Sequence, residues 1–115
     1  MKKNIKALAG LYPALITPFK GDFSLDLKPL EKIIPFYLEA GSTGLYIGGT
    51  TGEGILQTEE ERIRFMKEVI RIAQGSLKII VHVGANTTAE AVRLARAAEE
   101  AGADAVSSIP PIFYK

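Results

Sequence analysis

Short apolar segments alternate with longer amphipathic segments along the chain. The short segments are apolar on both faces, as in the run Lys78-Ile79-Ile80-Val81-His82-Val83, and this is typical of parallel strands that are covered by helices. They predict strands at residues 10–17, 44–48, 78–83 and 105–109.

The longer segments place apolar residues at helical spacing and predict helices over residues 26–40, 58–74 and 87–101. Asp26 is expected to cap the first helix, and Pro35 is expected to kink or shorten it. Thr58 is followed three residues later by Glu61, which predicts a capping box. Thr87 and Glu90 repeat that spacing and predict a second capping box.

The alternation of strand and helix predicts an α/β fold with a parallel sheet. Strand centres recur about every 31 residues, and eight such units give the roughly 250 residues of a (β/α)8 TIM barrel. We therefore expect residues 1–115 to form the N-terminal half of a TIM barrel, a partial domain truncated after its fourth strand. A flavodoxin-like or Rossmann sheet is the alternative, but the glycines of residues 49–54 follow G-x-x-G-x-G after the second strand, and no P-loop is present.

Composition narrows the functional classes. The 115 residues carry a net charge of +1 and are 47% hydrophobic, which argues against disorder and against a nucleic-acid-binding protein. With no cysteine and one histidine, neither a thiolate nor a histidine-rich metal site is expected. The basic start and apolar residues 7–19 resemble a signal peptide, but Pro13 and Pro18 interrupt the run, so we expect a cytoplasmic protein without a membrane segment.

In a barrel, the site lies at the C-terminal ends of the strands, so the loops that follow the strands are the candidates. In residues 48–54, glycines surround Thr50 and Thr51, and such a loop can turn backbone N–H groups and hydroxyls toward an anion such as a carboxylate. The same residues also suit a tight turn whose hydroxyls cap the backbone. Glu53 is either a buried acid that stiffens this turn or a solvated one.

Two further residues have both a functional and a structural interpretation. Tyr114 follows the fourth strand and can exchange a proton with a substrate, or it is simply an aromatic residue on a loop. His82 lies within a strand between apolar residues and is interpreted as a core or interface histidine.

The motifs in these loops resemble the N-acetylneuraminate lyase and dihydrodipicolinate synthase family over the whole chain. The residues that carry the resemblance are Gly48-Gly49-Thr50-Thr51-Gly52-Glu53, Leu15-Ile16-Thr17-Pro18-Phe19 and Ile109-Pro110-Pro111-Ile112-Phe113-Tyr114. The resemblance implies a class I aldolase on a TIM barrel, usually a homotetramer, that uses no cofactor and no metal. A lysine forms a Schiff base with pyruvate or a related 2-keto acid.

By the same resemblance, Thr50, Thr51 and Gly52 bind the substrate carboxylate and Tyr114 moves a proton to or from the substrate hydroxyl. The doubled glycine at residues 48–49 and the ending at residues 113–115 look more like the lyase, which splits N-acetylneuraminate into N-acetylmannosamine and pyruvate. Thr50 departs from the serine usual in the lyase. Dihydrodipicolinate synthase, a non-catalytic carboxylate-binding protein and a half-barrel that pairs with a partner remain alternatives.

The resemblance places the Schiff-base lysine on the sixth strand, beyond this chain. Lys20 and Lys115 are the two lysines that follow expected strand ends, and neither matches the family's nucleophile. We therefore expect the isolated chain to be inactive.

Overall fold

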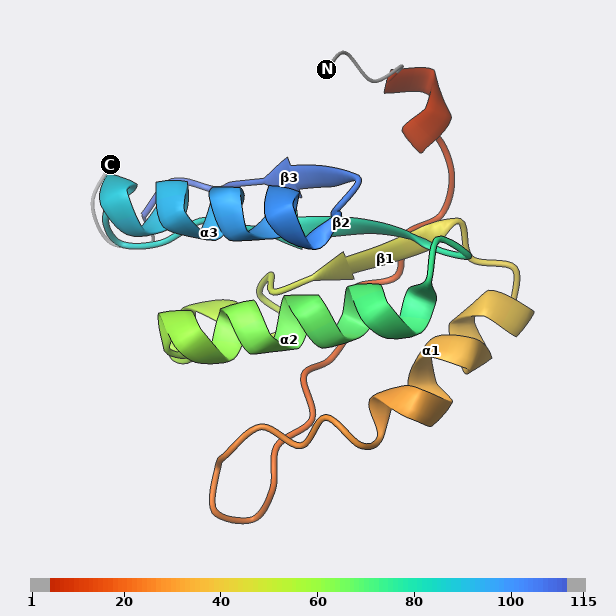
Figure 1. Cartoon of the computed structure of the whole chain (residues 1–115), viewed down its shortest axis with the longest axis horizontal. Helices are drawn as coiled ribbons and strands as arrows, with labels where there is room; N and C mark the ends of the chain where they lie inside the picture. The colour runs from red at the N-terminus through yellow and green to blue at the C-terminus, as the bar shows by residue number, and fades with distance from the viewer. Residues whose placement is uncertain (1–4, 112–115) are drawn as a thin grey trace.

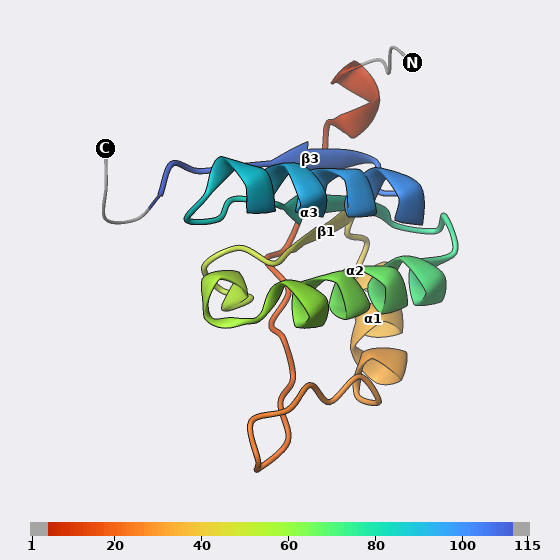
Figure 2. The same ribbon diagram turned by 60° about the vertical axis from the view of Figure 1, so that its left-hand side comes forward.

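A parallel sheet with helices on one face forms the centre of the computed structural model, which describes residues 5–111. The strands are β1 (Gly44–Ile47), β2 (Lys78–His82) and β3 (Ala105–Ser107), in that order. The helices are α1 (Leu30–Glu39), α2 (Glu59–Ala73) and α3 (Thr88–Ala101), with short 3-10 turns η1 (Ile5–Leu8) and η2 (Gly54–Leu56). Figure 1 and Figure 2 show α2 and α3 side by side over the strands.

Strand register gives the sheet two different faces. On the covered face, Leu45 pairs with Ile79 and Ile47 with Val81, and each of these side chains is at most 2% exposed beneath the helices. Burying such a side chain stabilises the fold by about 1.5–3 kcal/mol.

The opposite face carries Tyr46, Ile80 and Ala105 in register across the three strands, and these residues are only partly buried. In the part of the chain that the structure describes, no helix covers this face. One covered and one open face are what part of a closed barrel presents.

The strand expected at residues 10–17 is not a regular strand in the structure. Its segment runs parallel to β1 and forms one bridge, Ala14 with Tyr46, in which the Leu15 amide donates to the Tyr46 carbonyl at 2.9 Å. Pro13 has no N–H to extend the ladder, so the segment aligns with β1 without becoming a regular strand. Three strands are therefore observed among residues 5–111 instead of four.

The first helix begins at Leu30, so the expectation that Asp26 caps it is wrong. The Asp26 amide instead donates to the Pro18 carbonyl at 2.9 Å and closes the loop between residues 18 and 26. Pro29 occupies the cap position. The helix then continues through Pro35 to Glu39, so the missing turn lies at its start and not at Pro35.

The caps of the other helices were better predicted. The Glu61 amide donates to the Thr58 hydroxyl at 3.1 Å and the Thr58 amide donates to the Glu61 carboxylate at 2.9 Å, which confirms that capping box. At α3, the Thr87 hydroxyl accepts from the Glu90 amide at 3.2 Å, which is one of the two hydrogen bonds of the capping box expected there.

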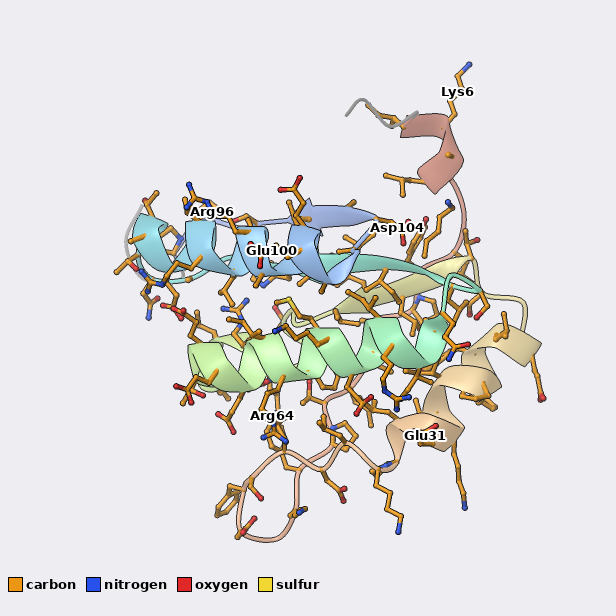
Figure 3. All side chains as sticks on the ribbon, in the orientation of Figure 1. Lys6, Glu31, Arg64, Arg96, Glu100 and Asp104 are labelled. Atoms are coloured by element: carbon orange, nitrogen blue, oxygen red, sulfur yellow. The ribbon has the colours of Figure 1, made fainter. Side chains whose placement is uncertain are left out.

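Charged side chains cover the outer surfaces of the helices (Figure 3). Ion pairs join neighbouring helices: Arg93 lies 2.8 Å from Glu59, and Arg71 lies 3.0 Å from Glu31. These pairs are exposed and add little stability. Among residues 5–111, no helix combines the length and the apolar character that crossing a membrane requires.

The open face and the β3 edge predict that the 115-residue polypeptide self-associates. Val106 on β3 is 48% exposed, and an exposed strand edge recruits further strands. We expect the apparent mass in size-exclusion chromatography to rise with concentration, and V106K to reduce that rise. V92K is the control, since Val92 lies on α3 and is 43% exposed. A monomer at every concentration would contradict the prediction.

Candidate active site

The loop of residues 48–54 leaves the end of β1 and folds back on itself. The Glu53 amide donates to the Thr50 carbonyl at 3.0 Å, and the Gly54 amide donates to the Gly49 carbonyl at 3.1 Å. Gly48 has a φ of 73°, and a Cβ on Gly54 would lie 2.0 Å from the Gly48 carbonyl oxygen. The glycines are therefore required for the close return of the backbone.

Buried side chains from two other segments hold this loop at Gly52. The Thr17 hydroxyl donates to the Gly52 carbonyl at 2.6 Å, and the Gln57 side-chain amide donates to the same oxygen at 2.9 Å. Thr17 is 4% and Gln57 is 9% exposed. Thr17, from the first-strand motif, thus helps to fix the loop of residues 48–54.

Thr50 and Thr51 lie at the tip of the loop with their side chains exposed. No other residue in the range 5–111 accepts a hydrogen bond from the backbone N–H groups of Thr50, Thr51 or Gly52. These three residues line a cavity of about 220 Å³ on the open face of the sheet, with Tyr46 and His82. Two hydroxyls and nearby amides thus border a space large enough for a small carboxylate.

Tyr46 lies on the sheet below this loop and was missed in the sequence. Its hydroxyl donates to the Ser107 hydroxyl at 3.1 Å, across β2, and so joins β1 to β3 on the open face. Its ring also lies where a Cβ on Gly49 would be, at 2.6 Å. Its position between Leu45 and Ile47, two buried residues, is the signal that could have placed it on the opposite face.

His82 is 7% exposed, as expected for a core histidine, but its ring connects two loops. Nδ1 lies 3.0 Å from the Gly48 carbonyl oxygen, and the Ile109 amide donates to Nε2 at 3.4 Å. Burial lowers the pKa of His82 below its ordinary 6.5, the Gly48 carbonyl opposes this effect, and the Arg62 charge adds to it. The use of the Ile109 amide by His82 explains why β3 ends at Ser107 and not at residue 109.

Arg62 holds the same strand end from the helical side. Its guanidinium donates to the Gly84 carbonyl at 2.8 Å and to the His82 carbonyl at 2.9 Å, and the residue is 5% exposed. Burial lowers the pKa of Arg62, although Glu90 opposes this change, and an arginine remains charged. The sequence could have revealed this buried arginine, because Arg62 lies at helical spacing from Met66 and Val69 on the apolar face of α2.

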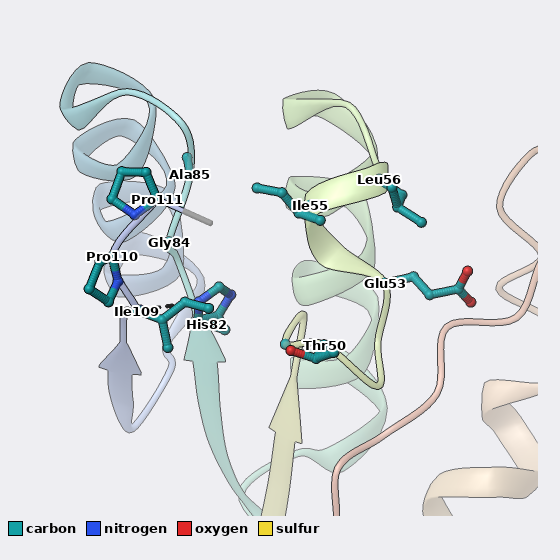
Figure 4. A pocket seen from close by; sticks show the side chains of 11 residues that line it. Thr50, Glu53, Ile55, Leu56, His82, Gly84, Ala85, Ile109, Pro110 and Pro111 are labelled. Carbon is teal, nitrogen blue, oxygen red and sulfur yellow. Dashed lines mark hydrogen bonds between the residues drawn. The ribbon is translucent and has the colours of Figure 1, made fainter. Parts of the chain in front are cut away.

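A second cavity of about 280 Å³ lies beside the loop tip (Figure 4). Its apolar walls are Ile55, Leu56, Ala85, Ile109, Pro110 and Pro111, and Thr50, Glu53 and His82 also line it. Glu53 is exposed and has a φ of 54°, so the interpretation as a solvated acid is correct.

Three of the residues singled out in the sequence are not observed in this site. Tyr114 and Lys115 lie outside the described residues, so the structure does not place the proposed proton donor. Lys20 lies in an exposed turn in which its amide donates to the Ser24 carbonyl at 2.8 Å. No cluster of three potential metal-binding side chains occurs between residues 5 and 111.

The model of the dihydrodipicolinate synthetase family matches residues 7–115. The chain belongs to this family. It is 40% identical over 107 residues to the N-acetylneuraminate lyase of Rhizobium meliloti, covering 93% of this chain and 36% of that protein.

Solved structures agree on the fold. The N-acetylneuraminate lyase of Proteus mirabilis superposes with a TM-score of 0.89 at 40% identity, over 94% of this chain and 37% of the other. The dihydrodipicolinate synthase of Aquifex aeolicus gives 0.86 at 36% identity, over 90% and 35%. The prediction of a partial TIM barrel is confirmed, and the chain spans little more than a third of the length of its relatives.

The lowered pKa of His82 predicts how stability depends on pH. Below pH 6.5, the unfolded histidine takes up a proton that the folded, buried ring resists, so the unfolded state binds more protons and the fold loses stability. We expect the free energy of unfolding in urea to fall as the pH drops through the ordinary histidine pKa of about 6.5, until the pH reaches the lower pKa of the folded ring. H82Q should remove most of that decline. An unchanged pH dependence in H82Q would show that other groups cause it.

Proposed function

We propose that this chain supplies the carboxylate-binding part of the active site of a class I, pyruvate-dependent aldolase that cleaves N-acetylneuraminate into N-acetylmannosamine and pyruvate. The observation that carries the proposal is the exposed pair Thr50 and Thr51, on a glycine turn at the C-terminal end of β1. Carboxylates accept hydrogen bonds from hydroxyls and backbone amides, and such charge-assisted bonds are stronger than neutral ones.

The role of this pair is to orient the keto acid for reaction. A lysine amine attacks the keto carbon, water leaves, and a protonated imine forms. The bond between the α and β carbons then breaks and its electron pair forms an enamine with the iminium, while the hydroxyl on the β carbon loses its proton and that carbon becomes the aldehyde. The enamine takes up a proton at the α carbon, and water hydrolyses the resulting imine to release pyruvate and the free lysine. In this proposal Thr50 and Thr51 hold the carboxylate, Tyr114 takes the hydroxyl proton, and the lysine lies on a strand outside this chain.

The lyase is preferred to dihydrodipicolinate synthase for two reasons. Curated relatives at 40–42% identity are N-acetylneuraminate lyases, and the doubled glycine at residues 48–49 suits that branch. A solved dihydrodipicolinate synthase is also 41% identical and supports the alternative. Thr50 and the likeness to the synthase of Aquifex aeolicus favour the alternative. The Schiff-base mechanism, a homotetrameric assembly and a cytoplasmic location belong to the proposal and rest on the family resemblance.

The substrate is tested with the protein translated from the uninterrupted reading frame that contains this chain. We expect pyruvate to be released from N-acetylneuraminate, and T51V to lower kcat/KM by about tenfold to a hundredfold, since a bond to a charged group is lost. T51S retains the hydroxyl and is the matched control. Condensation of pyruvate with aspartate semialdehyde, without cleavage of N-acetylneuraminate, would assign the synthase instead.

Imine formation by the 115-residue chain itself is a separate prediction. A lysine becomes a good nucleophile when a hydrophobic pocket or a neighbouring cation activates its amine. Lys20 is exposed and lines neither of the two cavities at the loop of residues 48–54. We expect no mass increase when the chain is treated with pyruvate and borohydride. A stable adduct on this chain would overturn the assignment of the nucleophile to a later strand.

A further inference from the structure

His82 connects the two loops that carry the motifs of the site. Its ring lies between the start of the loop of residues 48–54 and the start of the segment that begins at Ile109 (Figure 4). The first loop presents Thr50 and Thr51. The second leads toward Tyr114. A single side chain therefore links the carboxylate-binding loop to the segment of the proposed proton donor.

The neutral ring satisfies both contacts with one tautomer. When Nδ1 carries the proton it donates to the Gly48 carbonyl, and the lone pair on Nε2 accepts from the Ile109 amide. A protonated ring has no lone pair on Nε2 and would set an N–H against the N–H of Ile109. Burial in the fold favours the neutral form.

The surroundings of the ring leave little freedom for another arrangement. A Cβ on Gly84 would lie 2.6 Å from Nε2, so the ring occupies the space that this glycine leaves open. Tyr46 faces the ring from β1 at 6.4 Å between centroids, Arg62 holds the His82 carbonyl from α2, and Glu53 borders the same cavity. The described part of β3 brings no titratable side chain to the ring.

We propose that His82, through its hydrogen bonds to Gly48 and Ile109, is a positioning residue that fixes the loop of residues 48–54 relative to the segment that begins at Ile109. The inference rests on the proposed function for its consequence, since the fixed loop is the one that binds the carboxylate. The two hydrogen bonds of the His82 ring, in contrast, lie within this chain and do not depend on any ligand. His82 contacts no reacting atom in this proposal and acts through the loops that it joins.

The first test titrates the 115-residue chain with pyruvate. Binding is monitored by NMR at the amides of Thr50 and Thr51. H82F removes both hydrogen bonds and keeps an aromatic ring, and we expect it to weaken pyruvate binding by about tenfold. H82Q keeps one donor and one acceptor and should recover most of the affinity. V81A is the matched control: Val81 lies on the covered face and is 2% exposed, so its truncation costs stability without removing either hydrogen bond of the His82 ring.

The second test needs no ligand and separates this inference from the proposed function. In the wild type, we expect the ¹⁵N shifts of His82 to show the tautomer protonated at Nδ1, and the Ile109 amide to exchange slowly. In H82F, but not in V81A, the Ile109 amide should exchange faster and the Thr50 and Thr51 signals should shift.

Each outcome bears on one of the two proposals. Unchanged loop signals and unchanged pyruvate affinity in folded H82F would overturn the positioning role, as would a ring protonated at Nε2. If the wild type fails to bind pyruvate while the ligand-free signals move as expected, the carboxylate-binding function is wrong and the positioning of the loop by His82 stands.

Discussion

Parallel pairing of strands with a fixed register is the constraint on which the rest of the structure depends. It brings the C-terminal ends of the strands to the same edge, so that loops from distant parts of the sequence meet there. It also decides which residues face the helices: Leu45, Ile47 and Val81 are buried, whereas Tyr46 and Ile80 lie on the open face. A shift by one residue would exchange these sets and would move Tyr46 away from the site.

Elements with strong local signals were predicted well from the sequence. Thr58 and Glu61 satisfy each other's backbone amides, so their spacing alone places the start of α2. The start of α1 was predicted wrongly, because Asp26 contacts a residue outside the helix and does not cap it. Its amide closes a loop with Pro18, which lies eight residues earlier, and a local capping pattern does not report such a contact.

The candidate site was predicted only in part, for a related reason. The glycine loop is a local feature, and the motif around Thr50 and Thr51 shows it directly. The residues that hold the loop act across long stretches of sequence: Thr17 reaches Gly52, and His82 reaches both Gly48 and Ile109. A polar residue within an apolar segment signals burial with a partner, but the sequence alone does not say which partner.

The cost of burying those polar residues shows why a rigid loop matters for the proposed chemistry. A buried polar side chain is costly unless it is hydrogen-bonded. Two such side chains meet at the end of β2: His82 on the strand, and Arg62, which reaches it from α2. Each is bonded to backbone carbonyls of the loops or strand ends around it, so the desolvation cost is offset only while those loops keep their positions. Movement of Gly48 would leave a buried donor unpaired at a cost of about 1–3 kcal/mol. The same contacts therefore hold the loop still before any ligand arrives, so that a bound carboxylate does not have to order it.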